Sequence, residues 1–569
     1  MKAKTFSKYL AKLEATASRN EITAILANLF SQSSAKEIDK ICYLSLGRLV
    51  PQYQSLEFNL AEKTMSKILA YAFQKSEKEI IEEFKKSGDL GNIAYNLTNS
   101  TRGGNLNIIQ LHQQLSAIAR QTGTGSQTRK TQLFSQLIHQ LADPLTSKYL
   151  VRITIGKLRL GFSDLTILDA LSWMKTGNKE LRPSIEKTYN ISADIGLVAK
   201  VFKQGGIKAL KKIRPRVGIP IRPALTERLN QPEKIIEKLG QPAIEPKYDG
   251  FRVQIHFNRA KKIVRIFSRR MENTTVMFPE IVAAVQKLPA KSAILDGEAI
   301  GINPKTGKFL AFQETAQRKR KYKIKEAAKK TPLNVFVFDV LYLNNKSLLE
   351  KPFFQRRQLL EKLLAHQRKI LKLTPQKIVK TAKELEKLFY YWVNRRLEGI
   401  VCKKTGSFYQ AGKRDFTWVK YKRAMKSHLA DTVDCLVMGY YRGRGRRSTF
   451  GIGAFLAGVW DPKKEIFITI AKIGTGLTDK QWREIRQRVD KINSKKKPGQ
   501  YFVPKALIPD IWASPGLVVE ILADEITKSP LHSSNLALRF PRMQRFRDKK
   551  PTDITSLPEI KKLYKMQKQ

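Results

Sequence analysis

A hexapeptide near the middle of the chain, Lys247-Tyr248-Asp249-Gly250-Phe251-Arg252, has the residue types and spacing best suited to chemistry. A lysine amine becomes a nucleophile when burial or a nearby cation lowers its pKa. Arg252 is close in sequence, and Gly250 leaves room for a ligand to approach the backbone. The hexapeptide therefore predicts a lysine nucleophile at the edge of a cleft. The alternative is a solvated lysine before an Asp-Gly turn, which a chain so rich in lysine also allows.

The residues after Gly250 alternate in polarity. The apolar set is Phe251, Val253, Ile255 and Phe257, and the polar set between them is Arg252, Gln254 and His256. This spacing predicts a strand whose apolar face covers a core while its polar face points the other way. Lys247 would precede this strand directly.

The composition indicates a large, basic, globular protein. A chain of 569 residues predicts three to four domains, and 42% hydrophobic residues argue against disorder. The formal net charge of +57 favours a polyanionic partner, with nucleic acid the obvious one. A general habit of lysine usage is the alternative, and both contribute because a DNA footprint needs only about 10–20 cations.

Several functional classes are excluded by what the chain does not contain. The cysteines, Cys42, Cys402 and Cys435, are too far apart for a zinc ribbon or a disulfide framework. The N-terminus has no apolar signal region, and no apolar run reaches membrane length. No Walker A motif is present, so we expect a cytosolic protein without a P-loop.

The periodicity changes along the chain and predicts three regions. Helical stripes, such as Leu133, Phe134, Leu137, Ile138 and Leu141, fill residues 1–215. A loop at residues 123–130 combines glycines with Arg129 and Lys130, which suits a phosphate backbone; a plain interhelical loop is the alternative. A proline-rich linker at 214–223 precedes alternating strands and helices over 216–428, including a buried strand at 334–343. Short strands such as 467–473 and 517–522 predict a small barrel over 429–569.

Lys247 is followed by an ordered series of short motifs. They are Phe267-Ser268-Arg269-Arg270, Asp296-Gly297-Glu298, Phe336-Val337-Phe338-Asp339, Glu398-Gly399-Ile400-Val401-Cys402-Lys403, Trp418-Val419-Lys420-Tyr421-Lys422, and Arg539-Phe540-Pro541-Arg542 with Arg547-Asp548-Lys549. Each alone has an ordinary explanation, since Asp296-Gly297 could form a hairpin turn, Phe338 could be core, and Glu398-Gly399 could end a helix. Together, and in this order, they resemble motifs Ia, III, IIIa, IV, V and VI of the covalent nucleotidyltransferases, with Lys247 in motif I.

The flanking regions resemble one branch of that superfamily. The loop at 123–130, the segments 156–161 and 218–223, Arg318-Lys319-Arg320 and 472–476 are similar to ATP-dependent DNA ligases of the archaeal and eukaryotic replicative type. The resemblance implies a multidomain α and α+β fold. Its parts would be a helical DNA-binding domain (1–215), an ATP-grasp-like nucleotidyltransferase or adenylation domain (216–428), and an OB-fold β-barrel (429–569).

The resemblance also implies roles for individual residues. Lys247 would take up AMP, Glu245 would read adenine, and Phe338 would stack on it. The other ATP-binding positions would be Arg252, Arg269, Glu298, Arg414, Lys420 and Lys422, with the two lysines neutralising the α-phosphate and lowering the pKa of Lys247. Glu298 and Glu398 would hold Mg²⁺, a hard cation suited to carboxylates. Arg542, Arg547, Asp548 and Lys549 would close over the leaving pyrophosphate on a mobile last domain.

The implied reaction is the sealing of nicks in duplex DNA with ATP and Mg²⁺, in replication, repair and recombination. We expect a cytoplasmic, nucleoid-associated monomer. A sliding clamp is a possible further partner that the sequence leaves undecided. An RNA ligase or a GTP-using capping enzyme is the second hypothesis, against which Glu245 and the helical region argue. A non-catalytic basic packaging protein is the third, and only the charge favours it.

Overall fold

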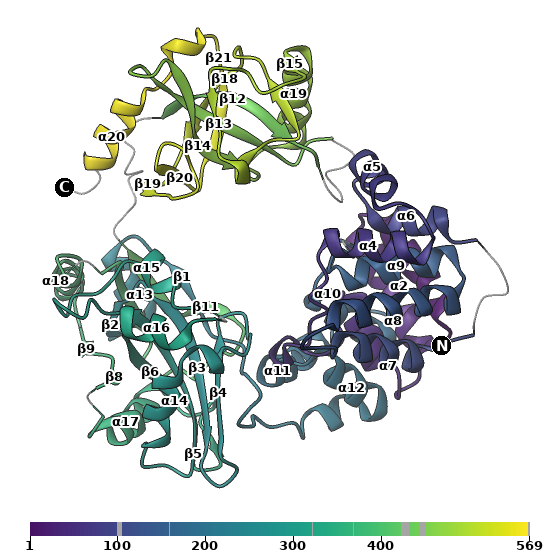
Figure 1. The fold of residues 1–569 in the computed structure, drawn as a ribbon. Coiled ribbons are helices and arrows are strands. Elements are labelled where there is room, and N and C mark those ends of the chain that lie inside the picture. The colour runs from purple at the N-terminus through teal and green to yellow at the C-terminus, as the bar shows by residue number, and fades with distance from the viewer. Residues whose placement is uncertain are drawn as a thin grey trace. The chain divides into compact units, whose positions relative to one another are not determined.

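The computed structural model describes residues 1–99, 105–158, 160–320, 322–367, 369–395, 397–422, 432–443 and 451–566. The chain divides into two compact units, Met1–Ile80 with Leu90–Arg423 and Ile81–Asp89 with Ala424–Gln569. Figure 1 traces their elements along the chain. The predicted boundary at 428/429 and Arg159 of the 156–161 segment lie outside the described residues.

The N-terminal part of the chain is helical, as predicted. Its α-helices are α1 (Ala3–Ala15), α2 (Arg19–Gln32), α3 (Ile38–Ser45), α4 (Glu62–Ala72), α5 (Glu77–Ser87), α6 (Leu90–Leu97), α7 (Ile108–Ala119), α8 (Ser126–Leu141), α9 (Pro144–Thr154), α10 (Asp164–Thr176), α11 (Arg182–Ser192) and α12 (Ile195–Leu210). The predicted stripe on α8 is buried at Phe134, Leu137 and Ile138. Apolar burial along such stripes holds the helices together.

The expected phosphate-binding loop at 123–130 is partly a helix. Gly125, with φ of 74°, precedes α8, which begins at Ser126. Lys130 is buried, and its Nζ donates to the carbonyl of Phe58 at 2.7 Å. The prediction that Lys130 contacts phosphate is therefore wrong, because its ammonium group is used inside the helical core. Arg129 is exposed and donates to the carbonyl of Thr122 at 3.1 Å.

Two sheets form the centre of the chain. The first has the order β1 (Leu225–Arg228), β11 (Arg414–Lys422), β10 (Gly399–Lys403), β2 (Ala243–Lys247) and β9 (Lys377–Ile378). The second has the order β4 (Ile263–Ser268), β3 (Phe251–Asn258), β5 (Ser292–Gly301), β6 (Leu333–Leu343) and β7 (Lys346–Ser347), with β8 (Leu371–Leu373) beside β6. The helices of this region are α13 (Pro232–Leu239), α14 (Pro279–Gln286), α15 (Phe312–Ala316), α16 (Ile324–Lys330), α17 (Phe353–Leu364) and α18 (Ala382–Val393).

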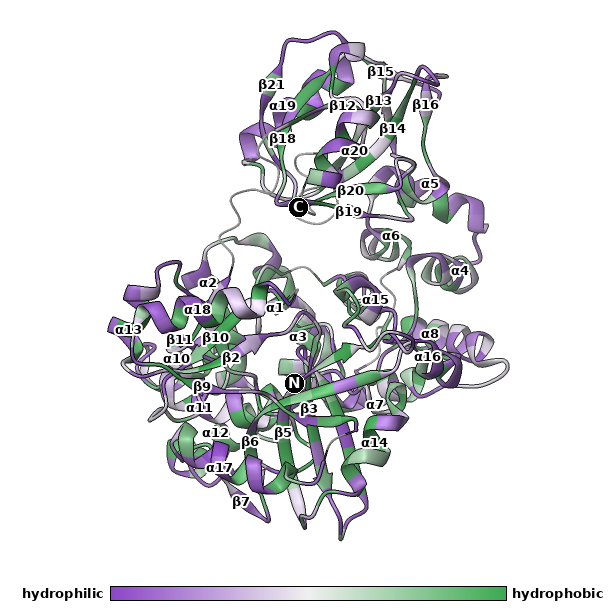
Figure 2. Cartoon of the chain, turned by 90° about the vertical axis from the view of Figure 1, so that its left-hand side faces the viewer, coloured by the Kyte–Doolittle hydropathy of each residue, from purple (hydrophilic) through white to green (hydrophobic). Residues whose placement is uncertain are grey.

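Helices cover one face of each central sheet. Residues of α13 and α18, among them Ile235 and Phe389, pack with Ile400 and Val419 of the first sheet. The second sheet buries its apolar face with residues of α14 and α17. Since each sheet has one face in a helix-covered core, the other face is available for polar side chains. Figure 2 shows hydrophobic and hydrophilic residues along β3.

The apolar and polar residues of β3 face opposite sides, as predicted, and most of the polar face is also buried. Phe251, Val253, Ile255 and Phe257 lie in the core of the second sheet, as predicted. On the other face, Gln254 accepts a hydrogen bond from the backbone N–H of Ile221 at 2.8 Å, and the N–H of Gly218 donates to His256 at 3.1 Å. The proline-rich linker therefore covers this face, because its backbone groups need the polar side chains of β3.

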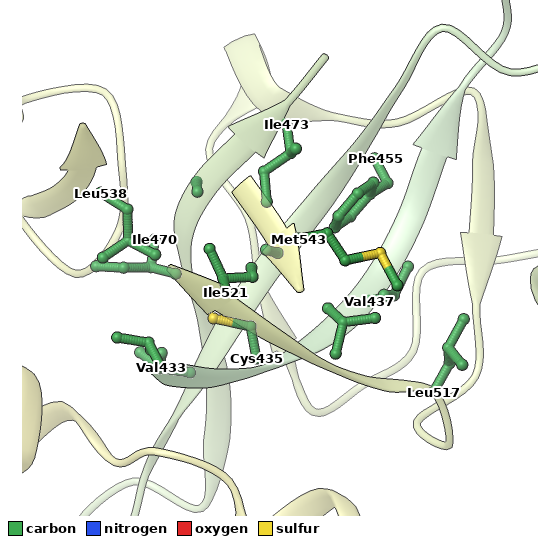
Figure 3. Packing of buried hydrophobic residues seen from close by; sticks show 14 of the residues in the cluster. Val433, Cys435, Val437, Phe455, Ile470, Ile473, Leu517, Ile521, Leu538 and Met543 are labelled. Carbon is green, nitrogen blue, oxygen red and sulfur yellow. The ribbon is translucent and has the colours of Figure 1, made fainter. Parts of the chain in front are cut away.

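The C-terminal part of the chain forms a curled sheet and a separate hairpin of β19 (Glu525–Lys528) and β20 (Leu536–Arg539). The strands of the curled sheet are β12 (Val433–Tyr441), β13 (Ala454–Asp461), β14 (Ile466–Ile473), β15 (Asn493–Ser494), β16 (Tyr501–Phe502), β17 (Ile511–Ala513), β18 (Val518–Leu522) and β21 (Arg542–Arg547), and the α-helices of this part are α19 (Asp479–Lys491) and α20 (Leu557–Met566). β12 pairs with β13, β17 and β18, and irregular pairing between Val437 and Gly439 bends it. Figure 3 shows the enclosed core, to which β12 contributes Val433, Cys435 and Val437.

The predicted strands at 467–473 and 517–522 correspond to β14 and β18. All three cysteines are buried and free. Among the described helices, none combines the length and the apolar character that a membrane crossing requires.

Candidate active site

Three neighbouring strands of the first sheet bring the central charged residues into register. Gly399 of β10 lies opposite Lys247 of β2 on one side and opposite Lys422 of β11 on the other. Two residues further along β10, Val401 lies between Glu245 and Lys420. Residues opposite each other across antiparallel strands share a face, so these side chains all project from the same side of the sheet.

Glycine is required at position 399 in the middle of this row. Its φ of 146° is unfavourable for other residues, and a Cβ there would lie 2.3 Å from the carbonyl oxygen of Tyr421. Gly250 serves a related purpose, since a Cβ there would lie 2.3 Å from the carbonyl oxygen of Ala299. The space that a side chain at position 250 would need is thus partly occupied by the backbone of β5, whether or not a ligand also approaches there.

A cavity of about 320 Å³ lies between the two central sheets. Its lining residues include Leu225, Glu245, Lys247, Val401, Lys403 and Trp418 from the first sheet and Arg252, Glu298 and Phe338 from the second, together with Arg269, Lys319 and Thr374. This volume lies at the lower end of the range for small-ligand sites. The cavity therefore unites residues from motifs far apart in sequence.

Lys247 stands at the end of β2 with its side chain 23% exposed. Its Nζ is 2.5 Å from a carboxylate oxygen of Glu398, whose other oxygen pairs with Lys422. Burial is the main cause that lowers the pKa of Lys247; Glu298 and Asp249 oppose the shift, and Arg269 adds to it. The pKa of Lys420 is in turn lowered by burial and by cations that include Lys247, so these two like charges repel each other, whereas Lys422 is paired with Glu398.

Glu298 lies opposite Arg252 across β3 and β5. Burial raises the pKa of Glu298 to about 7, although Lys247 and Arg252 act in the opposite direction. Asp296 and Gly297 lie within β5, so the alternative interpretation as a hairpin turn is wrong.

Arg252 is held mainly by protein groups. Its Nε and Nη2 donate to the two oxygens of Asp296 at 2.9 and 2.6 Å, and its Nη1 donates to the carbonyl of Ala224 at 2.6 Å. The guanidinium also lies over the ring of Phe338 at 5.3 Å. Few of its five donors therefore stay available for a ligand.

Glu245 is buried beside two cations. One carboxylate oxygen, Oε2, is 2.7 Å from Nζ of Lys403, and the other, Oε1, is 3.9 Å from Arg357. Burial raises the pKa of Glu245, while Lys403 and Arg357 oppose the shift. Oε1 has no hydrogen-bond partner among the described residues. A buried acceptor of this kind is suited to a ligand donor.

Phe338 and Lys403 lie close together in the lining of the cavity. The Nζ of Lys403 is 4.7 Å from the centre of the Phe338 ring and 4.4 Å from that of Trp418. Sequence reasoning gave Lys403 no role of its own. The two-residue spacing from Val401 in the same strand is the signal that could have placed it on the cavity face.

The remaining predicted residues are less closely gathered. Arg269 is exposed at the cavity, and Arg414 is exposed at the start of β11. In the C-terminal unit, Arg542 pairs with Asp524, while Arg547 and Lys549 both pair with Asp434. Asp548 is exposed there.

Comparison with known proteins identifies the family. Residues 2–172 match the DNA ligase N terminus, residues 223–422 the ATP dependent DNA ligase domain, and residues 448–550 the ATP dependent DNA ligase C terminal region. A probable DNA ligase of Dictyoglomus thermophilum is 45% identical over 572 residues, which cover 99% of this chain and 97% of that protein. DNA ligase 2 of Thermofilum pendens is 38% identical over 98% of this chain and 96% of that protein.

A solved structure named "Pmar-Lig_PreS3" shares the fold. It has a TM-score of 0.55 and 19% identity, and the match covers 95% of this chain and 99% of that one. The matched family domains favour neither an RNA ligase nor a capping enzyme. The chain belongs to the ATP-dependent DNA ligase family, whose activity is the sealing of nicks in DNA.

Proposed function

We propose that Lys247 is the nucleophile of this ligase and forms a covalent lysyl-AMP. The observation that carries the proposal is a half-buried lysine with a lowered pKa on the cavity, two residues after a buried carboxylate with an unpartnered oxygen. A lowered pKa increases the fraction of neutral amine, which is the reactive form.

The reaction would proceed in three balanced steps. The neutral Lys247 amine attacks the α-phosphorus of ATP and loses a proton to water, forming a P–N bond while the bond to the bridging oxygen breaks and pyrophosphate leaves. A 5′-phosphate oxygen of the nick then attacks the same phosphorus, the P–N bond breaks, and the Lys247 nitrogen takes up a proton from water as it leaves. Finally the 3′-hydroxyl attacks the 5′-phosphate, loses its proton, and releases AMP.

The cavity supports ATP in one orientation. The base would lie between Val401 of the first sheet and Phe338 of the second, with its 6-amino group donating to Oε1 of Glu245. Guanine has a carbonyl oxygen where adenine has the amino group, so a carboxylate there disfavours GTP. The phosphates would lie toward Lys420, whose pKa is lowered by burial and by nearby cations, among them Arg414 and Lys247.

Glu398 and Glu298 fit the chemistry of Mg²⁺. The carboxylate of Glu398 already binds two ammonium groups, and Glu298 lines the cavity close to Lys247. No cluster of three or more His, Cys, Asp or Glu side chains suited to a metal is found in the described ranges. Mg²⁺ prefers one or two carboxylates with phosphate oxygens, so these two residues would suffice together with ATP. When bound, the ion would neutralise charge developing on the phosphates.

The remaining proposals concern the oligomeric state, the domain boundaries and the C-terminal charged residues. We propose that the protein acts as a monomer. The division at 215/216 and 428/429 is supported by the separate family matches. A lid role for Arg542, Arg547, Asp548 and Lys549 stays a prediction. So do a sliding-clamp partner and a nucleoid location.

Covalent labelling tests the nucleophile. We expect wild-type protein incubated with α-labelled ATP and Mg²⁺, without DNA, to retain label after denaturation. Lys247→Ala and Lys247→Arg should retain none, because alanine has no amine and a guanidinium stays protonated. Lys346→Ala, which removes an exposed lysine of β7, is the matched control and should label normally. Label retained by either Lys247 variant would disprove the assignment.

A further inference from the structure

A second buried polar atom lines the cavity without a partner. Thr374 is 1% exposed and lines the same cavity as Glu245. Its hydroxyl, like Oε1 of Glu245, has no hydrogen-bond partner within the described part of the chain. Buried hydroxyls are normally hydrogen-bonded, so an unpartnered one beside a ligand cavity indicates a ligand contact.

The backbone of Thr374 is fixed on both sides. It follows β8, which runs parallel to β6 with Leu373 opposite Val337. The N–H of Thr374 donates to the carbonyl of Val337 at 3.0 Å, and its own carbonyl accepts from Nη1 of Arg357 at 2.9 Å. With both backbone groups satisfied, the hydroxyl is the one polar group of Thr374 left to bind a ligand.

Arg357 also ties Thr374 to Glu245. The nitrogen that donates to the carbonyl of Thr374 is 3.9 Å from Oε1 of Glu245. The nearby charged groups are Lys403, which binds Oε2 of Glu245 at 2.7 Å, and Asp339. One guanidinium group thus holds the hydroxyl-bearing residue and the carboxylate close together.

The two groups complement one edge of adenine. An ionised carboxylate only accepts hydrogen bonds, whereas a hydroxyl can donate one. The 6-amino group of adenine donates, and the ring nitrogens beside that position, N1 and N7, accept. We infer that Thr374 is a specificity-determining residue whose hydroxyl donates to a ring nitrogen of adenine while Glu245 accepts from the 6-amino group. This inference rests on the proposed function, in which ATP places its base in this cavity.

Two substitutions separate the hydroxyl from the shape of the side chain. Thr374→Val removes the hydroxyl at nearly constant shape, and Thr374→Ser keeps it. In self-labelling with ATP, Thr374→Val should raise KM about 10-fold with little change in maximal rate, because a donor to the base is lost. Thr374→Ser should stay close to wild type. If the contacted atom is N1, the preference for ATP over GTP should also narrow in the valine variant, because N1 of guanine carries a hydrogen; N7 accepts in both bases and would leave the preference unchanged.

Analogues of ATP identify the contacted atom. With wild-type protein, either 1-deaza-ATP or 7-deaza-ATP should show the same rise in KM of about 10-fold, and that analogue should lose nothing further in Thr374→Val. Without ATP, the valine variant should melt at the wild-type temperature or above, because the free protein loses no hydrogen bond.

The outcomes distinguish the inference from the function on which it rests. A wild-type protein that takes up no label overturns both. Normal labelling with an unchanged KM in Thr374→Val overturns the role of Thr374 alone. Should the valine variant fail to fold, wild-type protein decides the matter, since equal use of ATP and both deaza analogues would exclude a hydrogen bond from Thr374 to the ring.

Discussion

At the scale of single residues, burial shifts the pKa values of the charged groups in the site. Glu298 has its pKa raised to about 7 by burial, and Lys247 has its pKa lowered by the same cause. Each favours the charged form of the other, since the carboxylate raises the pKa of the lysine. The titration of Glu298 near neutral pH is therefore coupled to the charge of Lys247.

The first prediction concerns the pH dependence of self-labelling. The rate in wild type should rise from pH 6 to 8, as Glu298 ionises and the neutral fraction of Lys247 grows. In Glu298→Gln the carboxylate that raises the lysine pKa is lost, so the rising limb should move to lower pH by about one unit. Single-turnover labelling between pH 5.5 and 9 measures this. A midpoint that stays fixed or moves upward would contradict the coupling.

At the scale of elements, α17 is fastened to the second sheet by a buried ion pair. Nε and Nη2 of Arg356 donate to the two oxygens of Asp339 at 2.8 and 2.9 Å, and both side chains are fully buried. Asp339 follows Phe338 on β6, and Arg357 of the same helix reaches Glu245. This pair therefore helps to position both groups proposed to bind the base.

The second prediction removes one partner or both. Arg356→Met should destabilise the folded protein by about 3–5 kcal/mol, because it leaves the carboxylate of Asp339 buried without its counter-ion. The double variant Arg356→Met with Asp339→Leu should recover most of the loss, since no buried charge is left. Denaturant unfolding measures both. A single variant as stable as wild type would show that the pair contributes nothing to holding α17.

At the scale of the whole molecule, the net charge of +57 exceeds what one site needs. A ligase acts on nicks in any sequence, so it must hold DNA chiefly by phosphate contacts. The charges around Lys247 act at short range in a partly closed cavity, whereas those that face DNA are exposed to screening by salt.

The third prediction separates these two roles by ionic strength. Affinity of the full chain for nicked duplex DNA should fall with a log–log slope corresponding to about 8 or more released counter-ions. Self-labelling without DNA should change much less over the same range. Fluorescence titration of labelled DNA and covalent labelling at matched salt concentrations measure the two. If DNA affinity and self-labelling depended equally on salt, the exposed charges would not be the ones that distinguish DNA binding from catalysis in the cavity.

Local patterns in the sequence determined much of this protein. The alternation after Gly250 gave the apolar face of β3, and helical spacing gave α8. The ordered motifs gave the family and the residues around Lys247. These signals are readable because side-chain direction follows from spacing of two residues in a strand and of three to four in a helix.

Only the tertiary structure decided which residues meet across the chain. The row Lys247, Gly399 and Lys422 depends on the pairing of β2, β10 and β11, which are more than a hundred residues apart at their extremes. Lys130 is bonded inside the helical core. Arg357 contacts both Thr374, whose hydroxyl is unpartnered among the described residues, and Glu245. A buried polar group takes its partner from whatever the fold brings within hydrogen-bond distance, and no local spacing in the sequence encodes that distance.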